Sequence, residues 1–88
     1  MSYAIQITPS AERAMNRLPK ADRARVDRRI ADLANNPRSH GAVPLRGGGH
    51  GFWRIRLGDW RVVYKIHDDV LVVLVINVAH RREVYRGL

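Results

Sequence analysis

The 88-residue sequence contains no cysteine, and its longest apolar run, Val70 to Ile76, is far shorter than the roughly 20 residues of a membrane-spanning helix. Without cysteine there can be no disulfides, thiol nucleophiles or cysteine-ligated metal sites. The segment that follows Met1 lacks the apolar stretch of a secretory signal. We therefore expect a cytoplasmic protein that does not enter a membrane.

Acidic residues are also scarce, since 8 Asp and Glu stand against 16 Lys and Arg, which makes the formal net charge +8. Lys20 and Lys65 are the two lysines, so the remaining basic residues are arginine. Arginine suits bidentate contacts with phosphate, and this composition predicts a polyanionic partner, with nucleic acid first. A GC-rich genome also favours arginine for reasons unrelated to function.

The familiar catalytic sets are missing from the sequence. It has no pair of carboxylates in a recognisable general acid–base motif, no Ser-His-Asp arrangement with a nucleophile elbow, and no histidines at metal-ligand spacing. The glycine cluster from Gly47 to Gly51 lacks the strand-to-helix context and the Gly-Lys-Ser/Thr of a P-loop, so it reads as a flexible connection. We expect no metal and no cofactor.

Hydrophobic periodicity predicts a single α+β domain over residues 1–88, with element order β-α-α-β-β-β. The strands are expected at residues 3–7, 53–57, 61–66 and 70–78, and the helices at 9–18 and about 20–35. Thr8-Pro9 suits a helix N-cap followed by proline at the first helical position. The apolar stripes of both helices would cover one face of a mainly antiparallel sheet. Their outer faces mix arginines, Arg25 and Arg29 among them, with acids, as solvated helix surfaces usually do.

The pair Gly58-Asp59 predicts a two-residue type II′ hairpin turn, which sets the register of the strands around it. In that register Arg56 lies opposite Arg61, and Arg54 shares their face. Two directly opposed arginines repel by some tenths of a kcal/mol, so a chain that keeps them points to an anion site. An ordinary solvated face would show the same alternation. The other face is apolar and needs a covering layer: Trp53, Ile55, Leu57, Trp60, Val62 and Tyr64.

A set of cations together with a phenol suits phosphoryl chemistry, where catalysis rests on positioning and on neutralising charge at phosphate oxygens. RNA already carries its nucleophile, the 2′-hydroxyl. Arginine can clamp the phosphate but is a poor base, because it stays protonated. Tyr85 or His80 would therefore have to carry the proton transfer.

Five segments, in this order, carry a resemblance to a known family: Leu45 to Gly47, Trp53 to Leu57, Trp60 to Tyr64, Ile76 to Val78, and Ala79 to Tyr85. Together they resemble the RelE branch of the RelE/ParE toxin superfamily, over nearly the whole chain. The resemblance implies a toxin of a type II toxin–antitoxin pair. Its activity would be that of an endoribonuclease, free of metal, which enters the ribosomal A site and cleaves mRNA there by 2′-hydroxyl attack.

The resemblance also implies which residues form the site and which partners bind. The catalytic residues carried over are Arg54, Arg56, Arg61, Arg81 and Tyr85. We expect contacts with RNA or the ribosome from Arg46, Lys65, Arg82 and Arg86. The partners would be the ribosome, mRNA, and a RelB-like antitoxin whose acidic, partly disordered segment folds on the basic domain.

The sequence departs from the family at Arg54 and Arg56, where RelE has lysines, one of them a proposed general base. Arginine keeps the charge but loses an accessible deprotonated form. The base then falls to Tyr85 first and to His80 second.

Two other functions fit the resemblance. A ParE-like protein would use the same fold to inhibit DNA gyrase without catalysis, although ParE-like members generally lack the arginine face together with Arg81 and Tyr85. An inactive homologue would retain antitoxin binding alone.

Overall fold

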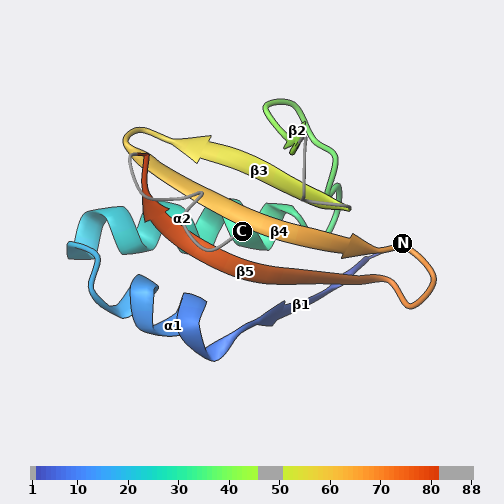
Figure 1. The fold of residues 1–88 in the computed structure, drawn as a ribbon, viewed down its shortest axis with the longest axis horizontal. Coiled ribbons are helices and arrows are strands. Elements are labelled where there is room, and N and C mark those ends of the chain that lie inside the picture. Colours follow the sequence, from blue (N-terminus) through green and yellow to red (C-terminus); the bar gives the residue numbers. More distant parts are fainter. Residues whose placement is uncertain (1, 46–50, 82–88) are drawn as a thin grey trace.

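The structure, a computed structural model, describes residues 2–45 and 51–81. Its elements, in chain order, are β1 (Ala4–Ile7), α1 (Pro9–Asn16), α2 (Lys20–Asp32), β2 (Val43–Pro44), β3 (Phe52–Leu57), β4 (Trp60–His67) and β5 (Val72–His80) (Figure 1). The strands form one five-stranded sheet in the order β1-β5-β4-β3-β2. The β1–β5 pair is parallel and the other pairs are antiparallel, which confirms the predicted α+β class with a mainly antiparallel sheet.

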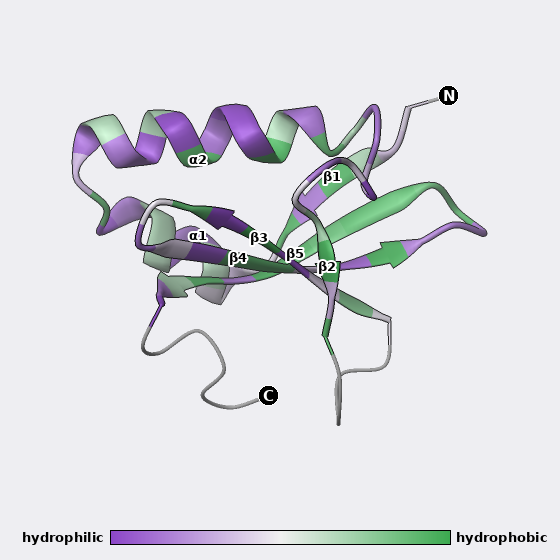
Figure 2. Cartoon of the chain, turned by 90° about the horizontal axis from the view of Figure 1, so that it is seen from above, coloured by the Kyte–Doolittle hydropathy of each residue, from purple (hydrophilic) through white to green (hydrophobic). Residues whose placement is uncertain are grey.

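The core lies between the two helices and one face of the sheet, and α2 runs along that face in Figure 2. Its helical members come from α1, α2 and the residues that follow each: Ala11, Met15, Leu18, Val26, Ile30 and Leu33. Its strand members are Ile55, Val62, Tyr64, Val73, Val75 and Val78. The helices therefore cover the apolar face that the hairpin register predicted. No helix in residues 2–45 and 51–81 has the length and apolar character needed to span a membrane.

Thr8 fixes the start of α1, as the sequence predicted. Its Oγ1 accepts a hydrogen bond from the Ala11 amide at 3.2 Å, and Pro9 occupies the first helical position. The same hydroxyl donates to the Ile76 carbonyl at 3.1 Å, beside the irregularity in β4–β5 pairing after Val63. This residue therefore ties the helix to the central strand.

The turn between β3 and β4 also agrees with the prediction. Gly58 has φ 57°, whereas Asp59 is not among the residues with positive φ, which is the pattern of a type II′ turn. The observed register pairs Leu57 with Trp60 and Arg56 with Arg61. Local turn chemistry was sufficient to predict this hairpin.

The predicted flexible connection from Arg38 to Gly51 contains regular structure in residues 38–45, while residues 46–50 lie outside the described residues. Val43 and Pro44 form the edge strand β2 against Arg54 and Trp53, and the Leu45 amide donates to the Phe52 carbonyl at 2.9 Å. A two-residue strand that contains proline is too short to show alternation, so it left no sequence signal. The last strand starts at Val72 rather than residue 70, and α2 ends at Asp32 rather than near residue 35.

A polar cluster beside the β4–β5 turn ties three segments together. Both terminal nitrogens of Arg38 donate to the Asp68 carboxylate, at 3.1 and 2.7 Å, and the Tyr3 hydroxyl donates to the same carboxylate at 2.6 Å. The Arg38 guanidinium also lies 5.6 Å from the Trp53 ring centroid. The hydrogen bonds from Arg38, and then that from Tyr3, lower the pKa of Asp68 from 3.8 to about 2.

This cluster predicts an acid-labile contribution to stability. The folded-state pKa of Asp68 lies below its unfolded value, so its contribution is complete above about pH 4 and is lost as the pH falls toward 2. We expect Asp68→Asn to lower the melting temperature at pH 6, and the difference from wild type to shrink at pH 2.5. Thermal unfolding followed by circular dichroism at both pH values measures this. A difference that stays constant with pH would contradict the prediction.

Candidate nucleic-acid interface

The face of the sheet opposite the helices carries the predicted arginines. Arg56 pairs with Arg61 across β3 and β4, and Arg54 pairs with Val63, so all four side chains share this face. Arg56 is exposed and Arg54 is half-buried, while Arg61 is only 9% exposed and Val63 is fully buried. The arginine face, defined here by Arg54, Arg56 and Arg61, is thus not a uniformly solvated surface.

Arg61 is anchored to the hairpin turn. Its Nη1 donates to the Gly58 carbonyl at 2.9 Å and to the Trp60 carbonyl at 3.0 Å. Carbonyl oxygens offset the positive charge, which reduces the cost of placing Arg61 opposite Arg56. The guanidinium is therefore held in place before any ligand arrives, and preorganised charge is what stabilises a developing phosphate anion.

Arg81, which directly follows β5, joins the same turn. Its amide donates to the Asp59 carbonyl at 2.7 Å, and its Nε lies 3.9 Å from the Asp59 carboxylate. Both side chains of this ion pair are more than half exposed, so the pair contributes little to stability. The Arg61 guanidinium and the Arg81 backbone amide are thus bound to successive residues of one turn, Gly58 and Asp59.

Lys65 extends the cationic surface toward the other end of β4. It pairs with Phe52 and, by strand alternation, lies on the arginine face. Its Nζ stands 5.7 Å from the Phe52 ring centroid. The face therefore presents cations along the whole β3–β4 hairpin.

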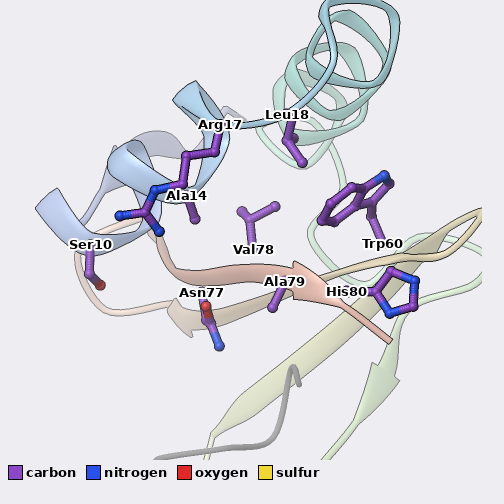
Figure 3. A pocket seen from close by; sticks show the side chains of 9 residues that line it. All are labelled: Ser10, Ala14, Arg17, Leu18, Trp60, Asn77, Val78, Ala79 and His80. Carbon is purple, nitrogen blue, oxygen red and sulfur yellow. The ribbon is translucent and has the colours of Figure 1, made fainter. Parts of the chain in front are cut away.

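His80 lies elsewhere. It pairs with Trp60 and shares the face of that residue, on the helix side of the sheet, where the two rings meet edge to face at 5.8 Å. It lines a groove of about 470 Å³ between α1 and the end of β5, next to Trp60, while Ser10 of α1 and Arg17, the C-cap of that helix, line the same groove (Figure 3). The strand register thus separates His80 from the arginines that it was expected to accompany.

Neither tyrosine within residues 2–45 and 51–81 suits the role of a base. Burial raises the pKa of Tyr64 to about 12, and its hydroxyl donates to the Pro37 carbonyl at 2.6 Å. The pKa of Tyr3 is also raised, chiefly because its hydroxyl donates to Asp68. A tyrosine that acts as a general base needs its pKa lowered toward neutral pH, which is the opposite shift.

Four predicted site residues lie outside the described residues: Tyr85, Arg46, Arg82 and Arg86. Within the described ranges no group of three or more His, Cys, Asp or Glu side chains is arranged to hold a metal ion.

The sequence did not single out Arg29 or His40, although both line a hollow with Arg54 and Arg56 at the β3 edge. Arg29 was expected on a solvated helix surface. It is instead half-buried, and its Nη2 donates to the Ser39 hydroxyl at 3.0 Å and to the His40 carbonyl at 3.1 Å. Helical periodicity places a residue on a face but does not say which loop will pack against it.

The chain matches a known toxin family over most of its length. The model of the family described as ParE toxin of type II toxin-antitoxin system, parDE, matches residues 5–85. The chain belongs to the RelE/ParE toxin superfamily. Toxin RelE of Mycobacterium tuberculosis (strain ATCC 25618 / H37Rv) is 41% identical over 85 residues, which cover 96% of this chain and 87% of that toxin.

Two further proteins from M. tuberculosis are similar to this chain. Toxin RelG is 33% identical over 87 residues, 98% of this chain and 99% of that toxin. The toxin–antitoxin complex RelBE2 contains a chain with a TM-score of 0.80 and 31% identity, over 92% of this chain and 100% of that chain. The resemblance seen in the sequence and the fold that it implied are both confirmed, and the chain is a toxin of the RelBE type.

Proposed function

We propose that this RelE-like toxin is a ribosome-dependent, metal-free endoribonuclease that cleaves mRNA in the ribosomal A site and so inhibits translation. The observation that carries the proposal is that one hairpin turn holds the Arg61 guanidinium and the backbone of Arg81, beside Arg56 on the arginine face. Preorganised guanidinium groups suit a phosphate that gains charge during reaction. We also propose a cytoplasmic location, as an activity on translating ribosomes requires.

In the proposed reaction the 2′-oxygen of the RNA attacks the adjacent phosphorus. A base removes the 2′-hydroxyl proton, the bond from phosphorus to the 5′-oxygen breaks, and an acid protonates that oxygen. The products are a 2′,3′-cyclic phosphate and a 5′-hydroxyl end. Arg61 and Arg81 neutralise charge on the phosphate oxygens, and Arg54 and Arg56 hold the flanking backbone. We assign the base to Tyr85 because His80 shares the face of Trp60. A tyrosine in this role needs cationic neighbours to lower its pKa.

Dependence on the ribosome follows from the limited acid and base equipment. Arginines supply charge but no proton transfer near neutral pH, so precise alignment of the 2′-oxygen must contribute much of the rate. A structured ribosomal A site would supply that alignment. We further propose a RelB-like antitoxin as a partner, supported by the solved RelBE2 complex of a similar chain and by the net charge of +8.

Primer extension on a defined mRNA tests the activity. We expect the wild-type protein to cut within the A-site codon when programmed ribosomes are present, and to leave the same mRNA uncut without them, because alignment then fails. A gel resolves the cleavage position to one nucleotide. The control is a ribosome complex whose A site is occupied by tRNA, which should protect the codon.

Absence of cleavage with programmed ribosomes would overturn the ribonuclease proposal. The ParE description of the matching family would then favour gyrase inhibition, to be measured as loss of DNA supercoiling. Inactivity in both assays, with antitoxin binding intact, would identify a homologue that only binds its antitoxin.

A further inference from the structure

A hollow of about 330 Å³ lies at the outer edge of β3, the edge opposite β4, where the short strand β2 pairs with Trp53 and Arg54 but does not extend to Leu57. Three segments line it: α2, the loop that follows α2, and the β2–β3 pair. The lining residues are Arg29, His40, Gly41, Val43, Arg54 and Arg56. Three arginines and a histidine therefore surround one hollow whose described lining contains no carboxylate.

Two of these arginines are held in place by the fold. Arg29 is half-buried and donates to Ser39 and to the His40 carbonyl, which fixes its guanidinium at the hollow. Arg54 is half-buried as well, and its Nε is fully buried without a hydrogen-bond acceptor among the described residues. A buried cationic group with an unpaired donor is costly, and an anion bound in the hollow would offset the charge of the Arg54 guanidinium.

Arg25 continues this cationic edge along α2. It lies one helical turn before Arg29, and its Nη1 is 3.7 Å from the position that a Cβ on Gly58 would occupy. Helix α2 thus places Arg25 at the hairpin turn and Arg29 at the hollow. The positive surface passes around the β3 edge from the arginine face to α2.

We propose that the hollow lined by Arg29, His40, Arg54 and Arg56 binds a phosphodiester of an RNA backbone outside the cleaved bond. The inference rests on the proposed ribonuclease function for its ligand class. Planar guanidinium groups grip a phosphate through paired N–H donors, and here they come from two separate elements, α2 and β3. The site would position RNA without taking part in the chemistry, as backbone contacts do.

Val43 offers a test that leaves every cation in place. It is 41% exposed, pairs with Arg54 and lines the hollow, so a carboxylate at this position would repel a phosphate there. Val43→Glu is the test variant, and Val43→Thr controls for loss of the apolar side chain. Val70→Glu is the charge-matched control, because Val70 is 64% exposed and does not line the hollow.

Fluorescence anisotropy with a labelled 12-nucleotide RNA, over a series of salt concentrations, measures affinity. We expect Val43→Glu to weaken binding about tenfold at low salt and to reduce the salt slope by about 0.7, the value for one lost contact to a single strand. The two control variants should stay within about twofold of wild type. The proposal would be overturned if Val43→Glu and Val70→Glu lost the same amount of RNA affinity, or if Val43→Glu lost none.

Ribosome binding then separates the two sources of the phosphodiester. The affinity of Val43→Glu is compared on ribosomes whose message ends at the A site and on ribosomes with a longer message. An equal loss of affinity on both supports ribosomal RNA as the source. A loss only with the longer message supports mRNA. Failure of the proposed function is distinguishable, because wild type would then not cleave while the hollow could still bind RNA. No binding of the 12-nucleotide RNA by wild type would overturn the proposal for the hollow, whereas A-site cleavage on programmed ribosomes decides the proposed function separately.

Discussion

Arg81→Ala is expected to lower the rate of A-site cleavage by about 10²–10³-fold, the usual cost of removing one preorganised donor to a developing oxyanion. The side chain leaves the sheet at the hairpin turn, and its backbone amide donates to Asp59, so the substitution removes the charge and keeps the backbone bond. Because Arg81 is exposed, we expect the melting temperature to change little. Single-turnover primer extension with saturating ribosome complexes measures the rate.

Two matched variants separate charge from orientation at this position. Arg81→Lys keeps a positive charge without the planar fork, so it should recover part of the lost rate. Asp59→Asn removes the carboxylate 3.9 Å from the Arg81 Nε, an exposed and weak pair, so it should stay within about threefold of wild type. Full activity in Arg81→Ala would remove Arg81 from the catalytic site.

Tyr64→Ala is expected to cost about 3–5 kcal/mol of unfolding free energy, a large part of the roughly 5–15 kcal/mol typical of a domain. Tyr64 is fully buried in the core, and its hydroxyl donates to the Pro37 carbonyl at 2.6 Å. The substitution therefore creates a cavity and also releases the loop after α2 from β4. Urea unfolding followed by circular dichroism gives the midpoint and the slope.

Tyr64→Phe isolates the hydroxyl. It keeps the ring in the core but leaves the Pro37 carbonyl without this donor, so we expect a cost of about 1–3 kcal/mol. If Tyr64→Phe were as unstable as Tyr64→Ala, the hydrogen bond rather than ring packing would dominate. If Tyr64→Ala lost less than about 1 kcal/mol, the core would be collapsing around the cavity, contrary to the packing seen here.

The anchoring of Arg61 distinguishes the arginine face from an ordinary solvated face of a sheet. Arg61 is nearly buried and bound to turn carbonyls, whereas Arg56, directly opposite, is exposed. A pair of opposed arginines in a solvated sheet would spread apart to reduce repulsion. Here one is fixed to the turn and the other remains available to a ligand. This asymmetry agrees with the roles that we propose, Arg61 as the charge clamp and Arg56 as a contact to the flanking backbone.

Interactions between residues close in the chain allowed the start of α1 and the register of the β3–β4 hairpin to be predicted from the sequence. Thr8-Pro9 starts α1 because a hydroxyl cap and a fixed proline φ act within one turn. Gly58-Asp59 sets the hairpin register because a two-residue turn leaves no freedom in strand pairing, and that register alone puts Arg54, Arg56 and Arg61 on one face. Each of these features depends on residues close together in the chain.

The tertiary structure decided what depends on distant contacts. Strand β2 forms because the loop after α2 reaches β3, and the same loop holds Arg29 in the hollow instead of on a solvated face. His80 shares the face of Trp60 because of its register on β4, which the irregular pairing after Val63 helps to set. Short edge strands, helix-to-loop hydrogen bonds and bulges have no periodic signature, so only the folded chain reveals them.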